Sequence, residues 1–275
     1  MSPRAKVSRI GAADLRQALN RRELVLHYQP RVDLASGRVA GAEALLRWAR
    51  PEQDLVLPGR ILPVAQAYGL MVPIGHWVLR EACAQAGRWI AAGLPFGSMA
   101  VNISGPELGE AGFARAVTGI LADTGLEPHR LLLEVAESAL MHDVEACART
   151  LRDLDEAGVQ LAVDDVGTGL SCLDQLGRVP VGMLKIDRSL VGDIALVAGA
   201  GAWVNAVVGA GHRLQRRVVA EGVENRAQID CLREMHCDEG QGHYFSQPLD
   251  ARHFAALLEI SMPAVVALDA ARLFL

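Results

Sequence analysis

The chain has 275 residues, of which 51% are hydrophobic and only 4% aromatic, and its formal net charge is −5. This length suits a single (β/α) barrel, and a core of this composition must be mainly aliphatic. The negative charge argues against nonspecific nucleic-acid binding, so we expect no nucleic-acid partner. No apolar run in the sequence is long enough to span a bilayer, and the polar start at residues 1–9 is unlike a signal peptide, so we expect no membrane insertion.

The cysteines are odd in number and scattered along the chain, at Cys83, Cys147, Cys172, Cys231 and Cys237. None is spaced as C-x-x-C, so neither a disulfide framework nor a zinc ribbon is expected. Free thiols of this kind suit a reducing compartment. We therefore expect a cytoplasmic protein.

Helical patterns alternate with short apolar strands along most of the chain. An amphipathic helix is predicted over residues 13–22, and further helices over 77–92, 112–123, 144–157 and 203–214. Eight strands are predicted, at residues 24–32, 39–47, 98–103, 131–135, 159–164, 183–187, 217–221 and 240–245. Such alternation favours a parallel sheet, and a closed TIM-like (β/α)8 barrel accounts for all eight strands.

The first two strands are joined only by the short turn at residues 33–37. A parallel crossover needs a dozen or more residues, so the first strand should run antiparallel to the second. The longest connection, between the second and third strands, leaves room for an extra helical segment around residues 58–69. We divide the chain into a helical lead-in at 1–23, a barrel at 24–259 and an apolar tail at 260–275.

Polar residues follow one another in strand order, each at the expected carboxyl end of its strand. They are Glu43, Asn102, Glu134, the pair Asp164–Asp165, Lys185 with Asp187, Glu221 and Gln241. A single acidic residue after a strand is commonly a helix cap or a solvated turn. A whole series in strand order is better explained by the active site that (β/α) barrels build at this face.

The stretch LAVDDVGTGL places two adjacent aspartates, Asp164 and Asp165, directly after an apolar strand. Neighbouring residues of a regular strand face opposite ways, so both carboxylates reach one place only if the strand stops there, as Gly167 and Gly169 permit. Two like charges this close disfavour each other's ionised state. We therefore expect a positive group between them.

The donor types indicate which ion this is. Carboxylates and an amide are hard oxygen donors that suit Mg²⁺, Mn²⁺ or Ca²⁺ rather than zinc. None of the eight histidines lies at these strand ends, and the pair His142–Asp143 is interpreted as a capping turn. Enzymes that catalyse in-line attack on phosphoryl groups commonly bind a pair of divalent ions, and two adjacent aspartates can coordinate both ions of such a pair.

With these motifs the chain resembles the EAL family of cyclic di-GMP phosphodiesterases, from residue 24 to about residue 254. The matching stretches are YQP, GAEALLRW, VNIS, LLLEVAES, DDVGTG, LKIDRS, AEGVE and QGHYFSQP. The resemblance implies hydrolysis of cyclic di-GMP to linear 5′-pGpG by two ions of Mg²⁺ or Mn²⁺. It also implies a homodimer. Because Ca²⁺ is larger and accepts looser coordination geometry, we expect it to bind but to inhibit.

The resemblance also implies a role for each position. One ion would be held by Glu43, Asn102, Glu134 and Asp164, and the other by Asp164, Asp165 and Glu221. Lys185 would activate the attacking water, so that Lys185, Glu43, Asp164 and Asp165 are the catalytic set. The substrate side is assigned to Arg47, which matches a phosphate-binding arginine, and to Gln241 and Asp187 as supporting contacts. Glu137 would anchor the loop that follows the aspartate pair.

The chain departs from the family pattern at several positions, none of them a metal ligand. Val166 replaces an aromatic residue, Ala136 a threonine, Gln66 a glutamate and His243 a tyrosine, and Leu170-Ser171-Cys172 stands where Tyr-Ser-Ser is common. The departures gather around the loop at 166–173. Two alternatives therefore stay open: a catalytically weak domain that senses cyclic di-GMP for a partner, and an unrelated barrel hydrolase of phosphate esters.

Overall fold

The structure is a computed structural model that describes residues 10–50, 55–142, 144–167, 179–195 and 199–260. Its strands are β1 (Leu24–Asp33), β2 (Val39–Trp48), β3 (Ser98–Ile103), β4 (Leu131–Ala136), β5 (Gln160–Val166), β6 (Met183–Ile186), β7 (Arg217–Ala220) and β8 (Glu239–Gln241). They form one closed barrel in chain order.

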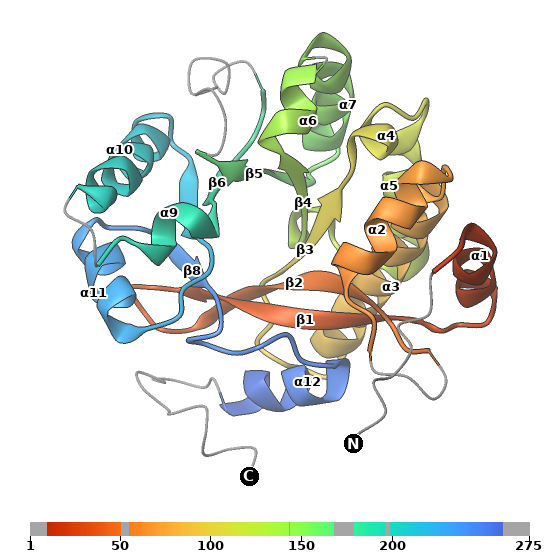
Figure 1. Ribbon diagram of the computed structural model, residues 1–275, viewed down its shortest axis with the longest axis horizontal. Helices are drawn as coiled ribbons and strands as arrows, with labels where there is room; N and C mark the ends of the chain where they lie inside the picture. The colour runs from red at the N-terminus through yellow and green to blue at the C-terminus, as the bar shows by residue number, and fades with distance from the viewer. Residues whose placement is uncertain (1–9, 51–54, 143, 168–178, 196–198, 261–275) are drawn as a thin grey trace, which may run out of the picture.

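Helices surround this barrel (Figure 1). They are α1 (Ala12–Asn20), α2 (Pro58–Ala67), α3 (Met71–Ala91), α4 (Gly105–Leu108), α5 (Phe113–Thr124), the 3₁₀ turn η1 (Pro128–Arg130), α6 (Glu137–His142), α7 (Val144–Glu156), α9 (Arg188–Gly192), α10 (Ala200–Arg213), α11 (Arg226–Glu234) and α12 (Ala251–Ile260). The extra helical segment expected near residues 58–69 is α2. Within the described ranges, no helix is both long and apolar enough to cross a membrane.

The predicted reversal of the first strand is confirmed. Strand β1 is antiparallel to both β2 and β8, whereas every other neighbouring pair is parallel. The turn that reverses the chain is closed by the Asp33 carbonyl, which accepts a hydrogen bond of 2.8 Å from the Gly37 N–H. Gly37 has φ +70°, a left-handed conformation that glycine adopts without steric cost.

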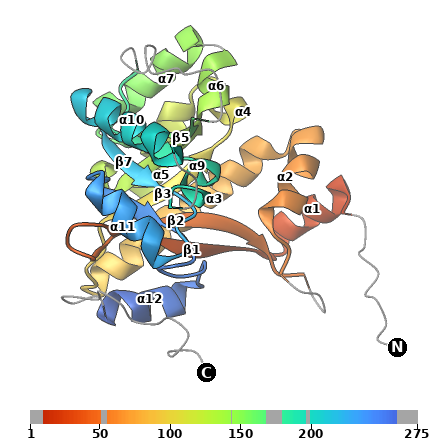
Figure 2. The same ribbon diagram turned by 60° about the vertical axis from the view of Figure 1, so that its left-hand side comes forward.

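The β1–β2 hairpin is longer than the barrel is tall. The two strands pair from Leu24↔Trp48 to Val32↔Val39, but β2 pairs with β3 only from Gly41 to Ala44. The rest of the hairpin runs out past the barrel toward α1 and α2 (Figures 1 and 2). Strand β2 thus agrees with the predicted strand at residues 39–47. Glu43 lies where the barrel part of this strand ends, and β2 continues beyond the barrel rim because β1 satisfies its backbone hydrogen bonds.

Inside the barrel the side chains form layers. A buried apolar layer consists of Ala100, Leu132, Ala162, Met183 and Val219. Since side chains alternate across a strand, the residue two positions further along each strand also faces inward, one layer nearer the carboxyl ends. Those residues are Asn102, Glu134, Asp164, Lys185 and Glu221. The predicted site residues thus lie directly on the apolar layer that fills the barrel.

Beneath the apolar layer, at the opposite end of the barrel, lies a buried ion pair. Arg31 Nη1 is 3.5 Å from Glu239 Oε2, and both side chains are almost fully buried. Arg31 Nη2 also donates to Ser98 Oγ at 2.5 Å. A Cβ on Gly41 would lie only 2.5 Å from Arg31 Nη2, so the glycine before the Glu43 segment leaves room for this arginine.

Candidate active site and metal centre

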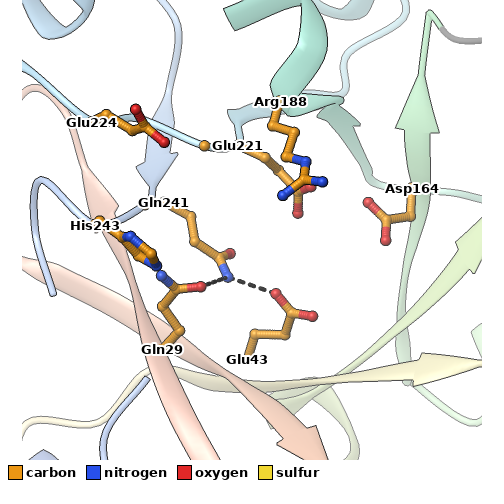
Figure 3. Close-up of a pocket in the computed structure, with 10 residues that line it drawn as sticks. Gln29, Glu43, Asp164, Arg188, Glu221, Glu224, Gln241 and His243 are labelled. Carbon is orange, nitrogen blue, oxygen red and sulfur yellow. Dashed lines mark hydrogen bonds between the residues drawn. The ribbon is translucent and has the colours of Figure 1, made fainter. Parts of the chain in front are cut away.

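A pocket opens over the polar layer at the carboxyl ends of the strands. Its lining comprises Gln29, Glu43, Asp164, Arg188, Glu221, Gly222, Glu224, Gln241, Gly242 and His243 (Figure 3). The hairpin and β8 supply one side of this lining. Strand β5, helix α9 and the segment after β7 supply the other. The pocket therefore brings together residues that lie up to 214 positions apart in the sequence, from Gln29 to His243.

Lys185 lies under this pocket at the centre of the acidic residues. Its side chain is fully buried, and its Nζ is 2.5 Å from Glu221 Oε1 and 2.7 Å from Glu134 Oε2. Two further carboxylates are close to the same atom, at 3.5 Å for Glu43 Oε2 and 3.6 Å for Asp164 Oδ1. The lysine and four of the predicted metal ligands thus form one cluster.

Four carboxyl groups surround one ammonium group in this cluster. Burial raises the pKa of Glu134 well above its usual value, and burial raises the pKa of Glu221 to about 7. Burial alone would lower the pKa of Lys185, but Glu134 and Glu221 outweigh it and hold that pKa well above its usual value. One ammonium group therefore does not suffice to keep all the surrounding carboxyl groups ionised, and a further cation among them would favour their charged forms.

Glu43 is fixed by two amide groups. Its Oε1 accepts a hydrogen bond of 2.6 Å from Asn102 Nδ2, and its Oε2 accepts one of 2.6 Å from Gln241 Nε2. The Gln241 amide also donates to Gln29 Oε1 at 3.1 Å. Burial raises the pKa of Glu43, but the charge of Lys185 and these amides outweigh burial and hold the pKa below its usual value. Glu43 is thus held as a carboxylate.

Asp164 and Asp165 face one site because the strand is bulged there. Asp165 has φ +59°, a left-handed conformation that aspartate tolerates better than most residues. The pairing of β5 with β6 shifts register between Val163 and Val166 and then resumes at Val166↔Ile186. Our expectation that the strand stops at the aspartate pair was therefore wrong. An extra residue in the strand turns both carboxylates to the same side.

The bulge assembles a three-carboxylate group. One ligand oxygen each of Asp164, Asp165 and Glu221 lies within 4.8 Å of the others. Close by, Glu134 Oε1 and Gln241 Oε1 are buried and accept no hydrogen bond within the described residues. Burying an oxygen atom without a hydrogen-bond partner costs free energy unless a ligand supplies the missing contact. Carboxylate and amide oxygens suit a hard divalent cation, so these residues fit a metal centre.

Comparison with known proteins places this barrel in a family. A family profile described as "EAL domain" matches residues 12–248. The chain belongs to the EAL domain family.

Relatives of this EAL domain include signalling enzymes of Pseudomonas aeruginosa. The bifunctional diguanylate cyclase/cyclic di-GMP phosphodiesterase MucR is 44% identical over 88% of this chain and 36% of the relative. The cyclic di-GMP phosphodiesterase NbdA is 42% identical over 86% of this chain and 30% of the relative. The chain thus spans about a third of the length of these curated relatives.

A solved structure has the same barrel. The MucR phosphodiesterase in its c-di-GMP complex matches with a TM-score of 0.84 at 43% sequence identity, covering 88% of this chain and 98% of that chain. Both the fold prediction and the family resemblance are confirmed.

Two residues predicted on the substrate side of the EAL site occupy other positions. Arg47 is buried, donates from Nη1 to the Leu46 carbonyl at 2.9 Å and does not line the pocket. Asp187 caps α9, where its Oδ1 accepts hydrogen bonds from Ser189 N at 2.9 Å and from Ser189 Oγ at 2.5 Å. Gln241, the third residue of this set, does line the pocket. The substrate roles of all three stay predictions.

The pocket of the EAL domain also contains side chains to which the sequence analysis gave no role. Gln29, Arg188 and Glu224 lie within the YQP, LKIDRS and AEGVE stretches, so the motifs themselves were the signal. His243 was noted only as a departure from the family pattern. These side chains lie together because the barrel places the ends of their strands side by side, which the motifs alone do not show.

The predicted anchor, Glu137, does contact the start of the loop after the aspartate pair. Its Oε2 accepts a hydrogen bond of 3.3 Å from the Gly167 N–H, and the side chain is buried. Glu137 is also the first residue of α6, so helix capping is a competing role. The hydroxyl groups of Thr168 and Ser171, in the same loop at 166–173, are further candidate partners for Glu137, and both residues lie outside the described ranges.

Replacing Glu137 with alanine separates these two roles. Loss of the contact to Gly167 should weaken Mg²⁺ binding and turnover together while the barrel stays folded, because glycine-rich backbone next to Asp165 is costly to order. Mg²⁺ titrations of activity, together with thermal unfolding, measure both effects. A lower Tm with unchanged metal affinity would instead show that Glu137 only stabilises α6. Glu156→Ala, at the exposed end of α7, is the control.

Proposed function

We propose that this EAL domain is a metal-dependent phosphodiesterase that hydrolyses cyclic di-GMP to linear 5′-pGpG. The observation that carries the proposal is the group of Asp164, Asp165 and Glu221 beside the buried Lys185. A cluster rich in hard oxygen donors suits divalent cations that act on phosphate esters. The names of MucR and NbdA, and the c-di-GMP bound to MucR, support the same substrate.

Two groups of residues would hold two ions of Mg²⁺ or Mn²⁺. One group comprises Glu43, Asn102, Glu134 and Asp164; the other comprises Asp164, Asp165 and Glu221. Bound divalent ions lower the pKa of water and neutralise charge on the phosphoryl oxygens. Asp164 belongs to both groups, because the bulge turns its carboxylate to the same side as that of Asp165.

Lys185 would orient the attacking water from beneath the ligands. Its Nζ contacts carboxylates of both groups, Glu134 at 2.7 Å and Glu221 at 2.5 Å. Fully buried and held on several sides, it cannot move far from this position. The carboxylate of Glu43, another member of the cluster, is fixed in place by hydrogen bonds from Asn102 and Gln241. These contacts keep both the cluster and the lysine preorganised, which is the main requirement of electrostatic catalysis.

The direct test is to incubate the purified protein with cyclic di-GMP and Mg²⁺ or Mn²⁺ and to identify the products by chromatography. We expect conversion to 5′-pGpG that stops when EDTA removes the metal. Tight binding of cyclic di-GMP with no conversion by either metal would contradict the enzymatic proposal. It would support the alternative of a cyclic di-GMP receptor that relays occupancy to a partner.

Calcium should fail to support the reaction and should inhibit it when added with Mg²⁺. Ca²⁺ is larger and accepts looser coordination geometry, so it would bind these oxygen donors yet misplace the attacking water. Initial rates at fixed Mg²⁺ over a Ca²⁺ series provide the measurement, with K⁺ at matched ionic strength as the control. Rates with Ca²⁺ alone that equal those with Mg²⁺ would contradict this expectation.

We further propose that the protein acts as a cytoplasmic homodimer that uses the surface beside the loop after Asp165. The support is an exposed aromatic side chain at this position: Trp203, on α10, is 43% exposed. A Cβ on Gly167 would lie 3.1 Å from Trp203 Nε1, so the indole lies next to the start of that loop. Sedimentation velocity of the wild type and of Trp203→Ala tests the assembly.

A further inference from the structure

The pocket has an uneven distribution of charge. Its lining includes four carboxylates, from Glu43, Asp164, Glu221 and Glu224. Arg188 is the only lysine or arginine among the described residues that line it. Cyclic di-GMP carries two phosphates and therefore two negative charges, so a cation at the pocket surface has a direct use.

The other cations near the site, Lys185 and Arg47, do not line the pocket. Lys185 is fully buried and surrounded by carboxylates, and Arg47 is buried and donates to a backbone carbonyl. The exposed guanidinium of Arg188, in contrast, makes no hydrogen bond or ion pair with a described residue. The charge of Arg188 helps to lower the pKa of Asp187 through space, but the Asp187 carboxylate already accepts hydrogen bonds from Ser189. Arg188 is therefore available to a ligand.

The position of Arg188 is set by close packing of its backbone. Gly222 has φ +66°, and a Cβ there would lie 2.4 Å from Arg188 Cβ and 3.2 Å from its Cα. Asp187, the preceding residue, is the N-cap of α9. The segment after β7 thus presses directly on the first residue of α9. In Figure 3 the Arg188 side chain reaches from α9 into the pocket, on the side of Glu221 and Asp164.

From this placement we infer that Arg188 is a substrate-binding residue that holds the phosphate of the cyclic dinucleotide that is not cut. The inference rests on the proposed function. The phosphate that is cut must reach the carboxylates around Lys185, at the buried floor of the pocket. Arg188 is exposed at the rim, so the phosphate it meets is the second one. A guanidinium offers a fork of N–H donors that matches phosphate oxygens.

The test compares Arg188→Gln, Arg188→Lys and the wild type in initial-rate kinetics with Mg²⁺. For Arg188→Gln we expect KM for cyclic di-GMP to rise about 10- to 100-fold, the scale of a charge-assisted hydrogen bond, with kcat changed less than about threefold. Arg188→Lys should fall between the two, because it keeps the charge but loses the fork. Bis(p-nitrophenyl) phosphate has a single phosphate, so its kcat/KM should be the same in all three proteins.

Arg213→Gln is the matched control. Arg213 is an exposed arginine at the end of α10, the helix that precedes β7, and therefore lies at the opposite end of the barrel from the pocket. It should leave KM for cyclic di-GMP unchanged. An unchanged KM in Arg188→Gln, or an equal loss on both substrates, would overturn the inference alone. A wild type that neither binds nor cleaves cyclic di-GMP would overturn the proposed function and this inference together.

Discussion

Replacing Asp164 with alanine should lower kcat by about 10³-fold or more, the greatest loss from any single ligand substitution, because this carboxylate serves both groups of ligands. Its Oδ1 lies 3.6 Å from Lys185 Nζ, and its side chain shares the three-carboxylate group with Asp165 and Glu221. Asp165→Ala removes a ligand from only one group and should cost less. Steady-state rates at saturating Mg²⁺ compare the two variants.

The control for this comparison is Asp155→Ala, which removes an exposed carboxylate from the outer helix α7. Its rate should equal that of the wild type. If Asp164→Ala kept a substantial fraction of wild-type turnover, the bridging assignment would be wrong. Calorimetric titration with Mn²⁺ adds an independent reading, since the variant should bind fewer ions than the wild type.

Replacing Lys185 with alanine should lower kcat by about 10²- to 10⁴-fold, the scale for a positioned proton-transfer or water-orienting group, with little change in KM. The substitution also leaves the carboxylates of Glu43, Glu134, Asp164 and Glu221 without their shared cation. Removing one partner of a buried ion pair typically destabilises a fold by roughly 3–5 kcal/mol. Thermal unfolding in EDTA should therefore show a lower Tm, and Mg²⁺ should restore part of it.

Two results would contradict this role of Lys185. An unchanged kcat with a raised KM would indicate phosphate binding instead of water orientation. A Tm in EDTA equal to that of the wild type would show that the cluster does not need the ammonium group. Lys185→Arg keeps the charge but not the shape, so it should retain stability better than activity.

The sequence alone determined the order of the site residues and their orientation toward one end of the barrel. The alternation of a strand is a local property: Ala100 and Asn102, Leu132 and Glu134, or Met183 and Lys185 face the same side in any regular strand. A short turn after Asp33 likewise forces the first two strands to be antiparallel, whatever the rest of the chain does. Both features follow from backbone geometry over a few residues.

The tertiary structure decided those features that depend on contacts between strands far apart in the sequence. The bulge at Asp165 exists because β6 pairs with Val163 and again with Val166, with one register shift between. Glu43 lies at the barrel rim because β3 pairs with β2 only from Gly41 to Ala44, whereas β1 pairs with β2 well beyond that point. No local pattern predicts either, since each depends on which strand lies alongside and for how long.

The same holds for the substrate side of the site. Arg47 shares the face of Glu43 by parity, yet it is buried and donates to a backbone carbonyl. Arg188 stood within the LKIDRS motif without an assigned role, and it reaches the pocket because Gly222 lets the segment after β7 pack against α9. Alternation along a strand sets the direction of a side chain. Packing between separate elements decides whether that side chain meets a ligand, a carbonyl or solvent.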